Sequence, residues 1–275
     1  MTYMKRILEC GLQGAALLLA SGLALCACSV KEDREPCPCY LNVSFQDREH
    51  IISEVRMTGY RETEVFREGI LVEEYDPYWV KAIHKGVLDF AAWKGVENGK
   101  DNGHYVTIDL GNQCDSLYAF HDVVDASGEM AYTDVLFHKQ FATVHLDIMK
   151  RPAEMQGYHF LVEGNTCGFD MFDFAPVSGA FRYDAVAAVG QRIVDFRIPR
   201  QSDDSMMVTV DYRYGDGKVE PIAELPLGRY IRETGYNWSA EDLQDIYIMV
   251  DLVVGRLIIS VDGWEDGVTF NFIEQ

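Results

Sequence analysis

The chain has 275 residues, of which 48% are apolar and 25% charged; this is ordinary globular composition and argues against a disordered chain. Its 24 Lys and Arg residues against 44 Asp and Glu give a net charge of −20. That charge disfavours nucleic-acid binding, because phosphate contacts need clustered basic side chains. The sequence lacks the repeated apolar runs of about 20 residues that a multi-span membrane protein needs. The length fits one or two domains of about 150 residues each.

The N-terminal segment has the features of a lipoprotein signal. A basic region at residues 5–6 precedes an apolar run over residues 15–27, which is short for a permanent membrane helix but fits a secretory signal peptide. A lipoprotein signal needs a small residue directly before the modified cysteine and an aliphatic residue three before it. Cys28 has Ala27 and Leu25 at these positions. We therefore predict cleavage before Cys28 and lipid attachment to it; a plain signal peptide with incidental cysteines is the alternative.

The segment after Cys28 indicates where the protein would be sorted. Ser29 stands where an Asp typically holds lipoproteins at the inner membrane, so we expect an outer-membrane location. The charged run over residues 31–34, Lys-Glu-Asp-Arg, resembles the acidic tether of surface-exported lipoproteins; a solvated linker is the plainer interpretation, and both can hold. Residues 1–27 are thus the predicted signal peptide and residues 28–38 a lipidated tether.

Four further cysteines would remain in the mature chain: Cys37, Cys39, Cys114 and Cys167. Cys37 and Cys39 are too close in sequence for an easy disulfide with each other. Cys114 and Cys167 could pair in an oxidising compartment or could be ordinary buried cysteines. No second Cys or His pair stands at zinc-site spacing, so the sequence predicts no metal site.

The sequence after the tether predicts β-strands. Residues 40–47 alternate, with Leu41, Val43 and Phe45 on one face. Further strands are expected over 87–93, 105–110, 117–124, 142–148, 158–162, 192–198, 206–214, 246–262 (a hairpin) and 268–272. One short helix is expected, with Ser239 as its N-cap. Short strands separated by turn residues favour antiparallel sandwiches, and we place an N-terminal domain over 39–187 and a C-terminal domain over 188–275.

Catalytic motifs are missing from the sequence. It contains no G-x-S-x-G and no H-E-x-x-H motif. Residues 95–101 faintly resemble a phosphate-binding loop, but the glycine spacing is short and Asp101 stands where Ser or Thr must hold magnesium. We interpret this stretch as a polar turn. The sequence therefore predicts neither an enzyme nor a cofactor, and no small-molecule substrate.

Histidines and tryptophans are the remaining candidate binding residues. His145 lies on the polar face of its predicted strand, where a surface histidine is commoner than a metal ligand. The four tryptophans, Trp79, Trp93, Trp238 and Trp264, could form a sugar-binding platform, although core packing is the more frequent role of aromatic residues on alternating strands. A surface glycan-binding lipoprotein with β-sandwich domains is thus the alternative function.

The segment from Cys28 to Leu41 resembles the opening of the fimbrillin-associated anchor family, the lipoproteins that fix type V pili to the outer membrane. The shared features are a lipidated cysteine, then Glu-Asp-Arg, then Cys-Pro and an alternating strand; Pro36 is a minor departure. Residues 196–200 and 261–264 resemble later parts of the family more weakly. The resemblance implies two tandem transthyretin-like β-sandwiches, no catalysis, and anchoring of fimbriae through strand-mediated contact with a fimbrial subunit. Residues 29–37 would reach only about 30 Å when extended, which keeps the protein near the membrane.

The lipid assignment is tested by replacing Cys28 with Ser. Without the thiol, acylation cannot occur, so we expect unprocessed precursor or soluble protein and no incorporation of radiolabelled palmitate. Palmitate incorporated into the Cys28→Ser chain at the wild-type level would contradict the assignment.

Overall fold

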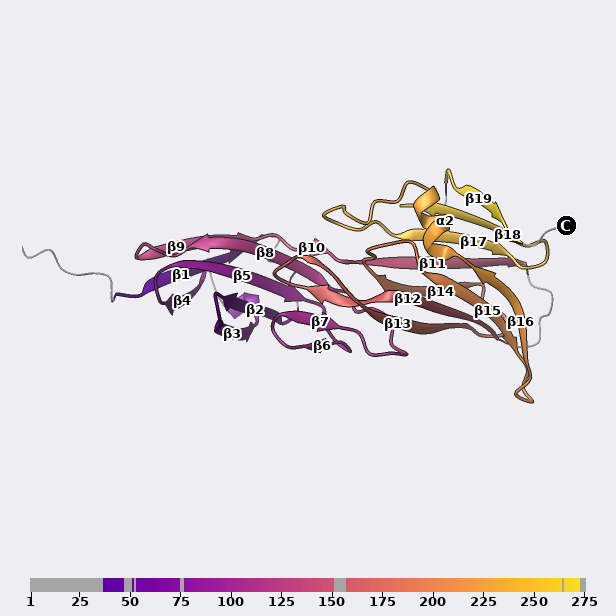
Figure 1. Cartoon of the computed structure of the whole chain (residues 1–275), viewed down its shortest axis with the longest axis horizontal. Helices are drawn as coiled ribbons and strands as arrows, with labels where there is room; N and C mark the ends of the chain where they lie inside the picture. Colours follow the sequence, from indigo (N-terminus) through magenta and orange to yellow (C-terminus); the bar gives the residue numbers. More distant parts are fainter. Residues whose placement is uncertain are drawn as a thin grey trace, which may run out of the picture. The chain divides into compact units, whose positions relative to one another are not determined.

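The structure is a computed structural model that describes residues 37–46, 51, 53–74, 77–150, 157–263 and 265–272. The chain divides into two compact units, Met1–Pro38 and Cys39–Gln275. The predicted signal peptide and Cys28 lie outside the described residues. The second unit is built of strands that form four sheets, with one short α-helix among its described residues (Figure 1). This confirms the predicted all-β fold of sandwiches.

The first sandwich pairs a three-stranded sheet with a five-stranded sheet. The three-stranded sheet has the order β4-β1-β9, with β1 (Cys39–Phe45) between β4 (Trp79–Ile83) and β9 (Met130–Val135). The other has the order β10-β8-β5-β2-β3; its strands are β2 (Val55–Tyr60), β3 (Glu64–Ile70), β5 (Val87–Lys94), β8 (Tyr118–Asp125) and β10 (His138–Lys139). A 3-10 turn, η3 (Val72–Glu74), lies between β3 and β4 in the chain.

The second sandwich also consists of two sheets. One has the order β14-β11-β17-β18-β19, formed by β11 (Phe141–Lys150), β14 (Ile193–Pro199), β17 (Ile246–Asp251), β18 (Arg256–Val261) and β19 (Val268–Asn271). The other has the order β16-β15-β12-β7-β6, with β13 also paired to β12; its strands are β6 (Lys100–Asp101), β7 (Tyr105–Thr107), β12 (Tyr158–Asp170), β13 (Ala175–Ala187), β15 (Met207–Arg213) and β16 (Val219–Leu225).

Not every neighbouring pair is antiparallel. The strand β1 pairs antiparallel with β4 but parallel with β9, and β11 pairs antiparallel with β14 but parallel with β17. Parallel neighbours cannot be joined by a tight hairpin. Accordingly, the chain passes through the opposite sheet before each parallel partner returns.

The hydrophobic cores divide the chain near residue 140. One core draws its buried residues from Cys39 to Val135 and the other from Ala142 to Phe270. The predicted boundary between residues 187 and 188 does not coincide with this division, because β12 and β13 place Tyr158, Phe160 and Phe181 in the second core. The limits of independently folding domains stay a prediction. A third, smaller cluster joins Trp93 of β5 to residues of β7 and β12.

The α-helix lies elsewhere than the sequence predicted. The structure has α2 over Leu227–Glu233, with Leu227, Tyr230 and Ile231 buried. The prediction of a helix capped by Ser239 is wrong. Ser239 lies in a turn where its backbone N–H donates to Asn237 Oδ1, because Asn side chains bond the backbone two residues on.

The segment before β17 fixes the start of β11. Asp245 Oδ1 accepts hydrogen bonds from Lys139 Nζ at 2.6 Å and from the backbone N–H of Thr143 at 2.8 Å. Although burial alone would raise it, the pKa of Asp245 is lowered overall, because these donors favour the charged carboxylate. This carboxylate therefore joins β10, β11 and the residues that lead into β17.

We expect Asp245→Asn to destabilise the fold by about 1–2 kcal/mol at neutral pH, since the bonds are charge-assisted but partly screened by solvent. A carboxyl whose pKa is lowered by folding stabilises the native state above its unfolded pKa of about 3.9, and this contribution disappears as the pH falls through the lower native pKa. The free energy of unfolding, measured in urea, should therefore decrease less between pH 7 and pH 3 in the Asp245→Asn chain than in the wild type. An identical pH profile for the two chains would contradict this assignment.

Candidate functional site

The described cysteines do not form a reactive or bridged site. Cys37, Cys39, Cys114 and Cys167 are all free thiols, so Cys114 and Cys167 are not paired in this structure. Burial raises the pKa of the Cys114 thiol, and its Sγ donates to the carbonyl of Asp115 at 3.3 Å. A buried thiol kept protonated is a poor nucleophile.

The loop that faintly resembles a phosphate-binding loop holds a carboxylate of the protein itself. The buried side chain of Asp115 accepts hydrogen bonds from the backbone N–H groups of Glu97, Asn98 and Gly99 at 2.7–3.1 Å. Position 95 requires glycine for a steric reason, because a Cβ on Gly95 would lie 2.0 Å from the carbonyl oxygen of Ser116. The predicted polar turn is thus a closed anion site with an internal occupant.

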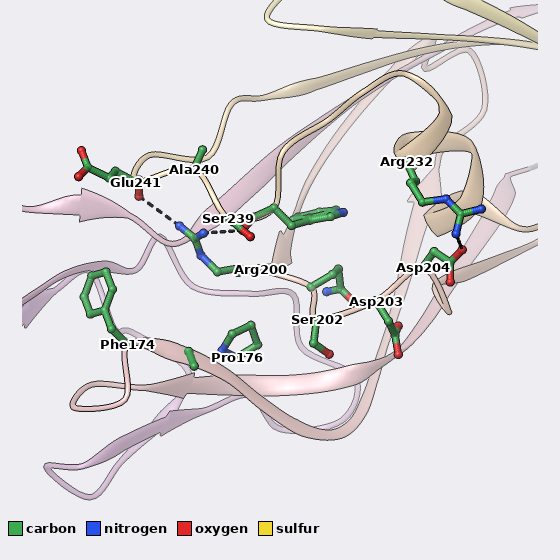
Figure 2. Close-up of a pocket in the computed structure, with 13 residues that line it drawn as sticks. Phe174, Pro176, Arg200, Ser202, Asp203, Asp204, Arg232, Ser239, Ala240 and Glu241 are labelled. Atoms are coloured by element: carbon green, nitrogen blue, oxygen red, sulfur yellow. Dashed lines mark hydrogen bonds and ion pairs between the residues drawn. The ribbon is translucent and has the colours of Figure 1, made fainter.

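A surface hollow with a mixed polar and apolar lining lies in the second sandwich, with a volume of about 690 Å³. The residues around it come from the start of β13, the segment after β14 and the turn after α2. Figure 2 shows Phe174 and Pro176 on one side and Arg232 with Asp204 on another, while Arg200 reaches the turn that carries Ser239 and Glu241. This arrangement brings together residues that the sequence does not connect.

Arg200 is bound within the protein. Its Nε donates to Gln140 Oε1 at 2.9 Å, and its two terminal nitrogens donate to the carbonyls of Trp238 and Glu241. Burial lowers the pKa of the guanidinium. These bonds use three of the five N–H groups of the guanidinium, one on each nitrogen, so Arg200 secures the turn after α2 to the β10–β11 connection.

Three other charged side chains at the hollow, Asp203, Asp204 and Arg232, are also engaged. Asp203 accepts from the backbone N–H of Ser205 and from Asn165 Nδ2, and Arg232 forms an ion pair with Asp204. Across the part of the chain that the structure describes, no group of three His, Cys, Asp or Glu residues is placed to hold a metal ion. The adjacent carboxylates Asp203 and Asp204 thus serve as local structural partners.

The aromatic residues are distributed differently from a sugar platform. Trp79 and Trp93 are buried in the core, which confirms the packing role predicted for them. Trp238 is half-buried beside the hollow, with its ring edge-on to Tyr236 at 4.6 Å. Trp264 lies outside the described residues. The three described tryptophans therefore do not meet on one exposed face.

His145 lies beside acidic and aromatic neighbours on the sheet surface. Its Nδ1 is 2.8 Å from Asp195 Oδ1, and its ring stacks on Tyr247 with centroids 4.6 Å apart. This placement agrees with the predicted surface role. No other His, Cys or carboxylate is grouped with this pair to hold a metal ion among the described residues.

Large exposed side chains gather on the outer face of the three-stranded sheet, which sequence reasoning did not find. Tyr40 of β1, Val80 of β4 and Met130 and Tyr132 of β9 are all exposed. Tyr78, just before β4, meets Tyr132 with ring centroids 5.9 Å apart. Alternation along residues 40–47 showed that Tyr40 points outward, but β4 and β9 carry no strong sequence signal of their own.

Known structures with this fold include proteins of Bacteroides thetaiotaomicron and Porphyromonas gingivalis. A candidate polysaccharide-binding protein of Bacteroides thetaiotaomicron aligns with a TM-score of 0.59 at 13% identity, covering 86% of this chain and 99% of that one. A fimbrial anchor protein of Porphyromonas gingivalis aligns with a TM-score of 0.57 at 13% identity, covering 83% and 98%. A candidate adhesin of B. thetaiotaomicron aligns with a TM-score of 0.54 at 14% identity, covering 88% and 100%.

This chain shares their fold. The likeness agrees with the family resemblance carried by residues 28–41, and it extends over both sandwiches. The sequence matches no protein-family model. It also matches no curated protein at a significant level.

The Asp115 site supports a stability prediction. Asp115→Ala leaves three backbone N–H groups without their acceptor, so we expect a loss of about 3 kcal/mol in the free energy of unfolding, while Asp115→Asn should cost less. Asp109→Ala is the matched control, since its carboxylate is exposed and paired only with Lys100, and it should change stability by less than about 0.5 kcal/mol. Equal unfolding midpoints for Asp115→Ala and the wild type would contradict the structural role of the loop.

Proposed function

We propose that this chain is a surface-exposed outer-membrane lipoprotein that anchors fimbriae by contact with a fimbrial subunit. The observation that carries the proposal is the combination of a lipoprotein-type N-terminus with the fold of a fimbrial anchor protein. The lipid on Cys28 would hold the chain at the membrane. The two sandwiches would then provide the surface for the fimbrial partner.

The chemistry of the described residues supports a binding role over an enzymatic one. An active site needs convergent polar groups with unspent hydrogen-bonding capacity. Around the hollow of the second sandwich, Arg200 and Asp203 are engaged with the protein's own groups. The structurally similar proteins are adhesins, anchor proteins and binding proteins. A non-enzymatic adhesive role is thus part of the proposal.

The part of the chain that the structure describes has no helix with the length and hydropathy needed to cross a bilayer. The proposed membrane attachment therefore depends on the lipid at Cys28. It also depends on a tether short enough to keep the first strand within about 30 Å of the acylated cysteine.

Glycan binding is the second candidate. It is favoured by the fold shared with a candidate polysaccharide-binding protein and by Trp238 beside the hollow. It is weakened by the burial of Trp79 and Trp93, because stacking on sugars requires an exposed ring face. A glycan array probed with the purified chain, in parallel with binding to fimbrial subunits, would separate the two functions.

Deleting the gene tests the anchoring function. Fimbrial subunits should still be made and folded, but fibres should detach from the cell and accumulate in the medium. Electron microscopy of cells and immunoblots of the medium measure this. Cells that keep a normal coat of attached pili, combined with no binding of purified chain to the fimbrial subunit, would put glycan binding first.

A further inference from the structure

One edge of the three-stranded sheet is open. The strand β9 pairs only with β1 among the described strands. The backbone N–H of Tyr40 donates to Glu129, and that of Gln46 donates to Val135. Because the direction of the backbone hydrogen bonds alternates along a strand, the backbone N–H and C=O groups of Ala131 and Thr133 also face β1.

The alternate residues on β9 therefore direct their backbone groups away from the sheet. These residues are Met130, Tyr132 and Asp134. Their N–H and C=O groups meet no other described strand. Unpaired groups of this kind form a template on which another extended chain can pair.

The side chains beside this edge are unusually apolar for an exposed surface. Met130 is 55% exposed and Tyr132 58% exposed, and Tyr40 and Val80 on the neighbouring strands are 49% and 51% exposed. The register places Tyr40 opposite Met130, and Asn42 between Val80 and Tyr132. The outer face thus continues across all three strands up to the open edge. Proteins usually protect such an edge with charges, proline or a bulge. Here one charged residue, Asp134, lies near the end of the open side, and Met130 and Tyr132 make the rest of it apolar.

The sheet has a second edge at β4, which pairs with β1 alone among the described strands. The strand β1 has a partner on each side, so an incoming strand could take its place only by displacing it. Near β4, Lys81 forms an ion pair with Glu68 of β3, and its Nζ lies 5.7 Å from the centre of the Phe66 ring. These contacts tie the inner face of β4 to the opposite sheet. The strand β4 has one large exposed apolar side chain, Val80, whereas β9 has two, Met130 and Tyr132, so β9 is the edge better suited to recognise an added strand.

The charge at the end of β9 indicates what kind of strand fits. Both carboxylate oxygens of Asp134 accept hydrogen bonds from uncharged groups, Ser44 Oγ at 2.8 Å and Gln46 Nε2 at 2.9 Å. Among the described residues, no basic side chain forms an ion pair with this carboxylate. The whole chain is acidic as well. A cationic residue opposite Asp134 would therefore be attracted, while an acidic one would be repelled.

We propose that the open edge of β9 accepts an extended segment of the fimbrial subunit, which pairs with the backbone of Met130, Tyr132 and Asp134. The segment has apolar or aromatic residues at alternate positions, which extend the exposed outer face, and Lys or Arg opposite Asp134. Main-chain bonds provide the affinity and the alternate side chains provide the selectivity. This inference rests on the proposed function and assigns the contact to one edge of one sheet.

Tyr132→Pro tests the edge directly. Proline removes an N–H that faces the open side and costs no bond to β1, so an edge strand tolerates it while an added strand cannot pair there. Thr269→Pro is the matched control, because β19 is also an edge strand. The Phe272 N–H donates to the Gly255 carbonyl, so Phe272 bonds toward β18. Bonding sides alternate along the strand, which places the Thr269 N–H on the open side of β19. Met130→Ser and Tyr132→Ser change the face and keep the backbone, and Val123→Ser on the exposed surface of β8 is their control.

The binding partner in the test is the major fimbrial subunit purified from pili of the same cells, and the chain begins at Cys37. We expect Tyr132→Pro to weaken binding at least about tenfold and each Ser variant on β9 several-fold, with both controls at wild-type affinity and all variants melting within a few degrees of wild type. Cells that produce the full-length Tyr132→Pro protein should release pili into the medium, as cells with the deleted gene should.

Three other outcomes would contradict either the assignment to β9 or the anchoring function, and they distinguish the two. If wild type and Tyr132→Pro bind the subunit equally, the assignment to β9 is wrong and the anchoring function stands. If Thr269→Pro weakens binding as much as Tyr132→Pro while both remain folded, the contact is not specific to β9. If the wild-type chain does not bind and the deletion keeps its pili, the proposed function is wrong, and the fimbrial occupant of β9 is excluded with it.

Discussion

The central position of β1 in its sheet is the constraint on which the rest of the first sandwich depends. This strand follows the predicted tether directly, and it hydrogen-bonds to β4 on one side and to β9 on the other. Leu41 and Val43 are fully buried in the core beneath it. Any displacement of β1 would break two ladders and expose that core, so the strand that follows the proposed lipid tether is also the strand that holds the sheet together.

The connection between the sandwiches combines polar contacts with a buried apolar cluster. Gln140 accepts from the buried Arg200, and Lys139 pairs with Asp245. Both contacts lie where the chain passes from β10 to β11. The apolar cluster joins buried residues of β5 and β8, among them Trp93, to buried residues at β7 and β12, among them Phe169. Buried hydrogen bonds of fixed geometry specify how chain segments meet more sharply than apolar packing does, which suits a protein that would carry mechanical load from a fibre.

Local alternation predicted the strands whose pattern is regular. Residues 142–148 form part of β11, and the hairpin predicted around Gly255 is formed by β17 and β18. Ile246, Ile248 and Val250 are buried, as expected. The strands β2, β3, β4 and β9 were not predicted, because they are short and mix charged or small residues with apolar ones. The parallel pairing of β1 with β9 joins residues about 90 positions apart, which no local pattern specifies. The exposed face therefore becomes visible only when β4 and β9 are placed beside Tyr40.

Residue-resolved hydrogen exchange tests the central claim most directly. In the free chain, the N–H groups of Tyr132 and Asp134 should exchange faster than those of Ala131 and Thr133, which are bonded to β1. When the purified fimbrial subunit is added, the account predicts that Tyr132 and Asp134 become as protected as their neighbours, while β19 is unchanged. Protection that appears elsewhere in the chain, with Tyr132 and Asp134 exchanging as before, would contradict it.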